Sequence, residues 1–255
     1  MFRLDGKTAF ISAARGHLGQ AMTRALAKAG AHVLINGRDA AAMAAYAREL
    51  RAEGLSVEPA VFDVLDIPAM TTFFAARPRL DILVNNAVAM HVKSFAALTA
   101  EDFARTYQSS VTAAFEAARA ALPALKAAAS ETGDACIINI ASMYGSVSPD
   151  PRLYDDPVRQ SPFHYGPAKA GLMQLTRHLA AELGPHRIRV NAIAPGPFPA
   201  TMSDPEFGKR LAARTMLGRL GNREEIGGPL LFLSGTCSTY VTGITLPVDG
   251  GWTAW

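Results

Sequence analysis

The chain has 255 residues, of which 49% are hydrophobic and 18% are charged, and its formal net charge at pH 7 is +3. This length and composition are typical of one large domain with a full hydrophobic core, and we take residues 1–255 as that single domain. A small net charge with no run of lysine or arginine argues against nucleic acid as a partner.

The two cysteines do not form a metal-binding or disulfide pattern. Cys136 lies in an apolar run and Cys237 in "SGTCSTY", and neither has a second cysteine or a histidine at ligand spacing. No apolar stretch reaches the roughly 18 residues that a membrane span needs. We therefore expect a cytoplasmic protein that binds no metal and no membrane.

Short apolar runs alternate with segments of helical periodicity along the whole chain. The predicted strands are 8–12, 31–37, 56–64, 80–88, 135–142, 188–196 and 243–251. The predicted helices are 18–30, 40–54, 67–77, 100–128, 163–184, 204–214 and 223–234. The strands are continuously apolar, which is typical of a parallel sheet covered on both faces. The sequence thus predicts an α/β fold: a doubly wound Rossmann-type parallel sheet of about seven strands with helices on both faces.

The first strand leads into a helix through "SAARGHLG", residues 12–19. Ligands of such sheets bind beyond the carboxyl ends of the strands, and the free N–H groups of a helix start favour an anion such as a pyrophosphate. A plain tight turn is the alternative interpretation. The residues that we expect to contact a dinucleotide here are Ser12, Arg15, Gly16, His17, Leu18 and Gly19.

Two residues of this loop stand where a phosphate loop favours glycine. Ala13 adds one methyl group, which is tolerable if the backbone angles allow a Cβ. His17 is the harder case, because a side chain at positive φ would cost about 1 kcal/mol or more, whereas at negative φ His17 starts the helix normally. We expect the loop to bind a dinucleotide, more weakly than a loop with all its glycines.

The second strand ends without the carboxylate that would accept the ribose hydroxyls of NAD. Gly37 occupies that place, and Arg38 follows it. An arginine suits a 2′-phosphate because its planar fork meets phosphate oxygens in a bidentate way, and Arg15 offers a second cation. NADP(H) is therefore favoured and NAD(H) is the alternative, while a solvated surface charge is the simplest interpretation of Arg38.

The third and fourth strands also end in polar residues. Asp63, followed by Val64, is placed to accept a hydrogen bond from an adenine amino group, although an ordinary acid at a strand end is as good an interpretation. Asn86 and Ala87, from "NNA", are placed to meet a ribose or to tie neighbouring backbones together.

A catalytic trio follows the fifth strand. Tyr165 and Lys169 lie four residues apart, on one face of a predicted helix, and Ser142 ends the strand before it. A nearby ammonium lowers the pKa of a phenol from about 10, so the phenol can exchange a proton with an alcohol or ketone oxygen near neutral pH. The serine hydroxyl can hold the same oxygen. The Tyr-x-x-x-Lys pattern alone is weak, and its weight comes from its position in the sheet.

Together these segments resemble the short-chain dehydrogenase/reductase family over nearly the whole chain. The similar pieces are "GKTAFISAARGHLG", "FDV", "ILVNNA", "NIAS", "YGPAK", "IRVNAIAPG" and "YVTGITLPVDGGW". The resemblance implies hydride transfer between a nicotinamide dinucleotide and a carbonyl or secondary alcohol. It implies that Ser142 orients the substrate oxygen, that Tyr165 is the general acid/base, and that Lys169 lowers the tyrosine pKa and binds the nicotinamide ribose.

The resemblance assigns further residues, and this chain departs from the family at some of them. Pro195, Gly196 and Thr201 would line the nicotinamide. Ser110 stands where the family often has an asparagine in its proton relay, and Val88 replaces the glycine of Asn-Asn-Ala-Gly.

The segment between Ser142 and Tyr165 looks about ten residues longer than is common in the family. It is a polar, proline-rich loop at 146–162, whose charged residues are Asp150, Arg152, Asp155, Asp156 and Arg159. A solvated loop is one interpretation, and a wall over the substrate is the other. The N-terminal third looks most like the gluconate 5-dehydrogenase branch, which favours a sugar, polyol or sugar-acid substrate. Candidate substrate-pocket residues, with core packing as their alternative, are His91, Met143, Tyr144 and Phe198.

Other functions remain open at this point. A 3-oxoacyl-type ketone reductase and a non-catalytic nucleotide-binding protein of the same fold are the main alternatives. Halohydrin dehalogenases share this fold but carry arginine in place of the family lysine, so Lys169 argues against them. The family resemblance also predicts a homotetramer, or a homodimer, built through the helices at 100–128 and at Tyr165.

Overall fold

The computed structural model describes residues 2–156, 158, 160–201 and 204–255, and its seven strands form one sheet. The strand order is β3-β2-β1-β4-β5-β6-β7, and every neighbouring pair is parallel. The strands are β1 (Thr8–Ile11), β2 (His32–Gly37), β3 (Val57–Val61), β4 (Ile82–Asn85), β5 (Ala135–Ile140), β6 (Ile188–Pro195) and β7 (Thr245–Val248). The predicted doubly wound parallel sheet is confirmed.

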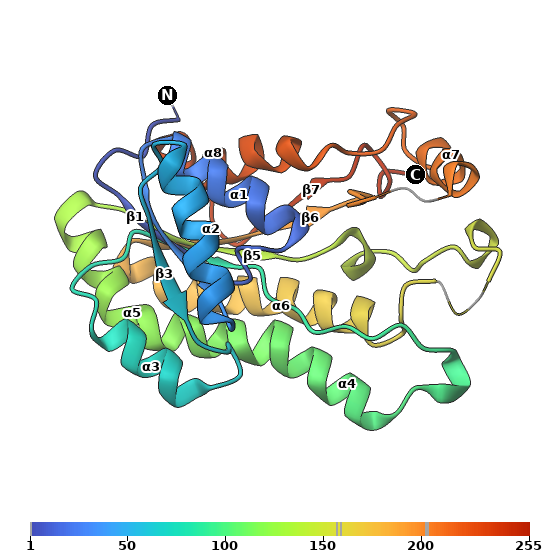
Figure 1. The fold of residues 1–255 in the computed structure, drawn as a ribbon, viewed down its shortest axis with the longest axis horizontal. Helices are drawn as coiled ribbons and strands as arrows, with labels where there is room; N and C mark the ends of the chain where they lie inside the picture. Colours follow the sequence, from blue (N-terminus) through green and yellow to red (C-terminus); the bar gives the residue numbers. More distant parts are fainter. Residues whose placement is uncertain (1, 157, 159, 202–203) are drawn as a thin grey trace.

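Helices cover both faces of the sheet (Figure 1). They are α1 (His17–Lys28), α2 (Ala40–Ala52), α3 (Ile67–Ala75), α4 (Ala100–Tyr107), α5 (Ala113–Thr132), α6 (Tyr165–Leu183), α7 (Pro205–Ala213) and α8 (Gly227–Ser234). One hydrophobic cluster packs α1, α2 and α8 against the sheet, and a second packs α3, α5 and α6 against the other face. Because the strands are apolar on both sides, each face buries a core, and the polar residues collect at the strand ends.

The structure differs from the single helix that the sequence predicts over 100–128. A π-helical turn at Gln108–Thr112 separates α4 from α5, and α5 continues through Pro123 to Thr132. Gly133 ends α5 in the left-handed conformation, with φ of 81°. A π turn inserts one extra residue into a helix, and it often marks a functional site. Hydrophobic periodicity does not reveal such a turn, because the apolar face continues across it.

Strand β4 is shorter than predicted, ending at Asn85 rather than at residue 88. The backbone after it leaves the sheet, and side chains from elsewhere bond its polar groups. The N–H groups of Asn86 and Ala87 donate to Ser12 Oγ, and the Ala89 N–H donates to Ser109 Oγ at 2.8 Å. The segment 86–94 therefore runs along the carboxyl end of the sheet as a wall.

Candidate active site

A groove crosses the carboxyl ends of the central strands and consists of two adjoining cavities. One cavity, of about 370 Å³, contains Tyr165, and we call it the tyrosine half. The other, of about 390 Å³, contains Arg38, and we call it the arginine half. Ala13 and Val88 line both, so the two halves meet at the loop after β1. The groove lies where ligands bind in open α/β sheets.

The loop after β1 places its strain at Ala13 rather than at His17. Ala13 has a φ of 50°, in the left-handed region, whereas His17 is the first residue of α1. The turn at Ala13 lets the Ala14 N–H donate to the Asn36 carbonyl oxygen at 3.0 Å, tying the loop to β2. The expectation that His17 is the harder case is therefore wrong. The alanine methyl group at this position costs about 1 kcal/mol relative to glycine.

The start of α1 has the chemistry of a phosphate site. Gly16 occupies the N-cap and, as a glycine, brings no side chain to bond the first N–H groups of the helix. Gly19 lies so close to the loop that a Cβ on it would collide with the Ala13 carbonyl. At the other wall, a Cβ on Gly196 would lie 2.6 Å from Asp249 Cα. The two glycines thus let the groove walls pack closely, and the free N–H groups of the helix start fit the pyrophosphate of a dinucleotide.

His17 faces this site in part. Its ring lines the tyrosine half, and within the described residues its buried Nε2 atom has no hydrogen-bond partner. Nε2 carries no solvent-accessible surface of its own, so the ring is packed at the side of the groove. His17 therefore starts α1 with a negative φ, which is the second of the two alternatives considered for it, and its ring lies at the edge of the site.

Ser142, Tyr165 and Lys169 come together in the tyrosine half. Ser142 lies two residues after the end of β5 and caps a short 3₁₀ turn, where its Oγ accepts from the Tyr144 N–H at 3.2 Å. Tyr165 is the first residue of α6, and Lys169 lies one turn further along it. Lys169 is buried, its Nζ donates to the Ile140 carbonyl oxygen at 2.7 Å, and it lies 5.7 Å from the centroid of the Tyr165 ring.

Burial sets the protonation of these groups. It lowers the pKa of Lys169 to about 8, because a charged ammonium loses its hydration inside the protein. It raises the pKa of the Tyr165 phenol for the same reason, and a hydrogen bond with Ser142 offsets this only in part. The expected lowering of the tyrosine pKa by Lys169 is not found. The ammonium bonds to the Ile140 carbonyl, so desolvation of the phenol dominates.

The arginine half is open and charged. Arg38 Nη1 lies 3.5 Å from Asp63 Oδ2, and the two side chains are 75% and 38% exposed. Both residues line this half together with Gly37, Val64 and Ala87. The side chain of Met43 occupies the space that a Cβ on Gly37 would need, so an aspartate or glutamate at position 37 would collide with it.

Several predicted cofactor residues take other places. Ser12 is buried, and its Oγ accepts from the N–H groups of Asn86 (2.8 Å) and Ala87 (3.0 Å), so it holds the groove wall in position. Arg15 and Thr201 are exposed, and neither belongs to the described residues that line the two cavities.

Ser110, predicted for a proton relay, lies within the π-helical turn. It is buried and lines a cavity of about 10 Å³ rather than the groove. Within the part of the chain that the structure describes, its Oγ has no hydrogen-bond partner.

The predicted substrate-pocket residues divide between roles. His91 lines the arginine half. Met143 is buried in a core cluster with Leu153, Leu211 and Trp252, so the core-packing interpretation describes it. The Tyr144 hydroxyl lies 3.0 Å from the Tyr154 hydroxyl, and burial raises the pKa of Tyr144.

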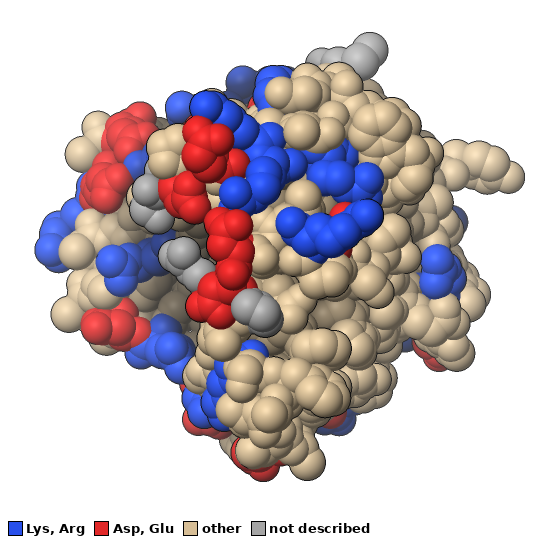
Figure 2. Space-filling view, turned by 90° about the vertical axis from the view of Figure 1, so that its right-hand side faces the viewer, with Lys and Arg blue, Asp and Glu red and all other residues tan. Residues whose placement is uncertain are grey.

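The polar loop at 146–162 folds back onto the C-terminal part of the molecule. Arg210 of α7 donates to the Leu153 carbonyl oxygen at 3.0 Å and pairs with Asp155 at 2.6 Å. Arg152 and Asp150 also form an ion pair. Acidic and basic side chains lie next to one another on this end of the molecule (Figure 2). Arg159 lies outside the described residues.

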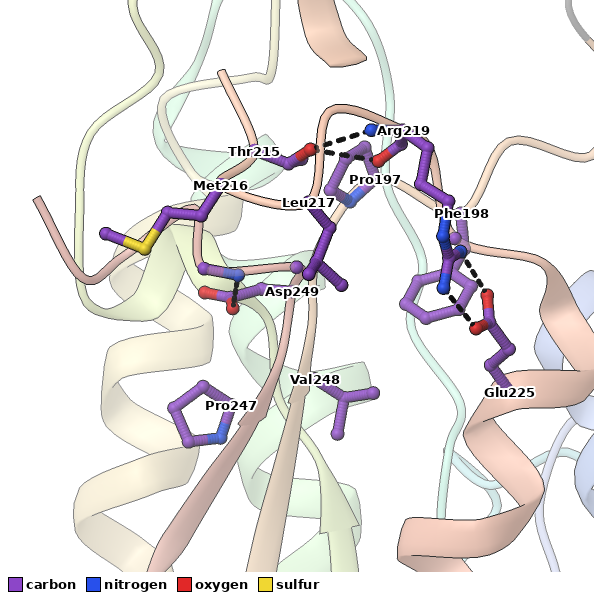
Figure 3. Close-up of a pocket in the computed structure, with 13 residues that line it drawn as sticks. Pro197, Phe198, Thr215, Met216, Leu217, Arg219, Glu225, Pro247, Val248 and Asp249 are labelled. Atoms are coloured by element: carbon purple, nitrogen blue, oxygen red, sulfur yellow. Dashed lines mark hydrogen bonds and ion pairs between the residues drawn. The ribbon is translucent and has the colours of Figure 1, made fainter. Parts of the chain in front are cut away.

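A side pocket of about 380 Å³ adjoins the tyrosine half (Figure 3). Phe198 lines both, and Leu217 and Val248 make the side pocket largely apolar. At its rim Arg219 forms a bidentate ion pair with Glu225, at 2.8 and 2.7 Å. Phe198, predicted for the substrate pocket, therefore separates the groove from an apolar space.

The groove has lining residues that the motifs do not identify. Most lie at or just after the ends of the same strands as the predicted ones, which is the signal that would have found them, whereas Arg105 and Ser109 come from α4 and the π-helical turn. In the tyrosine half they are Val88, Ile140 and Ala141, and in the arginine half Asn36, Leu65, Ala89, Met90, Arg105 and Ser109.

The described part of the chain brings together no group of three His, Cys, Asp or Glu side chains of the kind that holds a metal. Its described helices include none with the length and apolarity needed to cross a membrane.

Comparison with known proteins gives matches over nearly the full length. The family model described as enoyl-(acyl carrier protein) reductase matches residues 13–253. The rhamnolipids biosynthesis 3-oxoacyl-(acyl-carrier-protein) reductase of Pseudomonas aeruginosa is 35% identical, and the match covers 98% of this chain and 97% of that protein. The galactitol 2-dehydrogenase (L-tagatose-forming) of Cereibacter sphaeroides is also 35% identical, with 100% and 98% covered. The crystal structure of a gluconate 5-dehydrogenase from Burkholderia cenocepacia, in complex with NADP and tartrate, has a TM-score of 0.88 at 31% identity, with 100% and 98% covered.

Proposed function

From the premise that this chain belongs to the short-chain dehydrogenase/reductase family and is an oxidoreductase acting on CH–OH groups, we propose that it is an NADP(H)-preferring dehydrogenase of a sugar, polyol or sugar acid. The observation that carries the proposal is the groove itself. Ser142, Tyr165 and Lys169 meet at one end of it, and Arg38 stands at the other.

The residues along the groove fit a nicotinamide dinucleotide. The helix start at Gly16–Gly19 would hold the pyrophosphate, Lys169 the nicotinamide ribose, and Arg38 a 2′-phosphate. When bound, the nicotinamide would supply or accept a hydride. Asp63 shares Arg38, so the arginine would change partner from a carboxylate to a phosphate.

The catalytic residues of this chain would move the proton. With its pKa raised, the Tyr165 phenol is protonated at neutral pH and can donate to the oxygen of a carbonyl substrate. Ser142 would hold the same oxygen by a hydrogen bond. Below pH 8 Lys169 is largely charged, and its ammonium would stabilise the phenolate left after proton transfer. In the oxidation direction the same groups would act in reverse.

The polar substrate class is supported by relatives and by the polar loop between Ser142 and Tyr165. Around that loop lie the paired hydroxyls of Tyr144 and Tyr154 together with charged side chains. Similar proteins are named for galactitol and gluconate. We therefore propose a substrate with a hydroxyl-rich carbon chain, whose reacting carbon would lie near Tyr165.

A second candidate, a 3-oxoacyl-type ketone reductase, is favoured by one observation. The apolar side pocket beside Phe198 offers about 380 Å³ next to the tyrosine half, which suits an acyl chain better than a polyol (Figure 3). A relative of 35% identity is named for a 3-oxoacyl substrate.

An NADPH absorbance assay at 340 nm tests these proposals. Keto-sugars, keto sugar acids and 3-oxoacyl thioesters are offered in parallel, and the reverse reaction is run with NADP⁺ and polyols. We expect turnover with the hydroxylated substrates. Preference for 3-oxoacyl thioesters would select the second candidate. NADPH binding without turnover of any substrate would favour the non-catalytic alternative.

The proposal includes a cytoplasmic homotetramer. Helices α4 and α5 expose large aromatic side chains: Phe103, Tyr107 and Phe115 are each between 43% and 49% exposed. Exposed apolar area of this kind favours contact with another subunit. Light scattering is expected to give four times the mass of the 27.0 kDa chain, and a monomer would contradict it.

A further inference from the structure

The segment 86–94 lines both halves of the groove, although it belongs to no helix or strand. Backbone that lacks a helix or sheet ladder needs other partners for its polar groups. In the middle of this segment side chains provide them. The Ala89 N–H donates to Ser109 Oγ, and Thr106 Oγ1 donates to the Ala89 carbonyl oxygen, both at 2.8 Å.

His164 supplies a further bond from the neighbouring helix. Its Nε2 lies 3.1 Å from the carbonyl oxygen of His91, and because a carbonyl only accepts, Nε2 carries the hydrogen. Its Nδ1 lies 3.0 Å from Thr106 Oγ1. With the hydrogen on Nε2, Nδ1 accepts, so it shares the single Thr106 hydroxyl hydrogen with the Ala89 carbonyl oxygen. The ring is 1% exposed, so both contacts are made away from water, where they are strongest.

The position of His164 in the chain gives these bonds a functional meaning. It directly precedes Tyr165 and occupies the N-cap of α6, yet its side chain makes no capping bond and reaches across to α4 and the wall instead. Its neighbour Phe163 packs on Phe95, with 4.9 Å between ring centroids, and Phe95 directly follows the wall in the chain.

We propose that His164 is a positioning residue of the reaction proposed above: it fixes the wall at 89–91 against the helix start that carries Tyr165. The inference rests on the proposed function, because it couples the cofactor groove to the proton-donating phenol. A cofactor seated along the wall then meets Tyr165 at a set distance. Without the bond from His164 Nε2, the cofactor must order the wall when it binds, and this ordering lowers the affinity for the cofactor.

Hydrogen exchange on the whole protein, measured without and with NADPH, tests this coupling. His164→Leu replaces the ring by an apolar side chain of similar bulk and removes both contacts. We expect the Ala89 amide, whose N–H is bonded to Ser109 Oγ, to exchange at least about tenfold faster in this variant, while strands β1 and β5 are unchanged. NADPH should restore protection, but bind several-fold more weakly than to the wild type. His178→Leu, at an exposed position on the same helix, is the matched control and should change nothing.

A conservative variant separates positioning from plain packing. His164→Gln keeps a side-chain N–H near the His91 carbonyl, and it should return the exchange of the Ala89 amide to within about threefold of the wild type. With a responsive substrate, the ratio kcat/KM should follow the same order: wild type, Gln, Leu. Unchanged exchange in folded His164→Leu, or equal effects of Gln and Leu, would overturn the inference.

Two further arms keep the inference falsifiable. If His164→Leu does not fold, Thr106→Val, which removes the hydroxyl but keeps the shape, should accelerate exchange of the Ala89 amide, and no acceleration would overturn the inference. Failure of the proposed function shows differently, as absence of NADPH binding by the wild type. The exchange measured without NADPH still decides whether His164 holds the wall.

Discussion

The two halves of the groove are built on opposite principles. In the tyrosine half Lys169 and Ser142 are buried and Tyr165 is partly buried, and hydrogen bonds hold them: Lys169 donates to Ile140 at 2.7 Å, and Ser142 caps a turn after β5. In the arginine half Arg38 is 75% exposed and shares its charge with Asp63 at 3.5 Å. Chemistry requires fixed geometry and shifted pKa values, and burial supplies both. Recognition of a cofactor phosphate tolerates a mobile, hydrated side chain.

The largest expected effect lies in the buried half. Tyr165→Phe removes the only atom of this side chain that can donate a proton, and it leaves the arginine half untouched. We expect carbonyl reduction to fall by at least about 10²- to 10⁴-fold, the contribution typical of general acid catalysis, while NADPH affinity stays within about threefold. Steady-state assays and fluorescence titration check this, with Tyr240→Phe at a fully exposed position as the control. Retained turnover would remove Tyr165 from the mechanism.

A second prediction concerns the cost of burying Lys169. Its pKa falls from 10.5 to about 8 in the folded protein. Well above pH 10.5 the lysine is neutral in the folded and the unfolded protein, so its burial does not lower the free energy of unfolding. As the pH falls towards 8, the lysine takes up a proton in the unfolded protein but not in the folded one, which favours unfolding. The wild type should therefore gain about 2 kcal/mol of unfolding free energy between pH 8 and 10 relative to Lys169→Met. Urea unfolding at each pH measures it. A pH-independent difference would show that Lys169 is not desolvated.

A third prediction concerns the exposed half. Arg38→Ala should weaken NADPH binding by about fivefold to tenfold, because an exposed, shared charge contributes less than a buried one. NADH binding should stay within about twofold. Arg48→Ala, on the outer face of α2, is the control. Equal loss for both cofactors would mean that Arg38 supports the loop rather than a 2′-phosphate.

The difference between the halves also explains what sequence allows one to predict. The continuously apolar segments were enough to predict the parallel sheet. The motifs at the strand ends predicted residues that line the groove, among them Ser142, Tyr165 and Lys169. The protonation of the trio was not predictable, because whether Lys169 faces the phenol or the Ile140 carbonyl depends on packing distances.

Backbone conformation was equally hidden from the sequence. "SAARGHLG" shows two residues that replace glycine, but which of them takes a positive φ depends on the bond from Ala14 to β2. Side chains that act across elements, such as Ser12 on the wall after β4, have no local pattern either. The π-helical turn around Ser110 belongs to the same class.

The smallest predicted effect lies where the two halves meet. Ala13→Gly relieves the left-handed strain at φ of 50° and should stabilise the protein by up to about 1 kcal/mol, reduced by the extra freedom of glycine in the unfolded chain. Thermal unfolding measures the change. His17→Gly serves as the comparison and should bring no gain, because His17 already sits in a helix. A larger gain in stability from His17→Gly than from Ala13→Gly would show that the backbone strain lies at His17.

Calorimetric titration of the wild-type protein with NADPH and with NADH tests the central claim, that both halves together form a dinucleotide groove selective for the 2′-phosphate. We predict that both cofactors bind at one site per chain and that NADPH binds about tenfold more tightly, with most of that difference lost in Arg38→Ala. Equal affinities or a preference for NADH would contradict the role of the arginine half. Binding of neither would contradict the groove as a cofactor site.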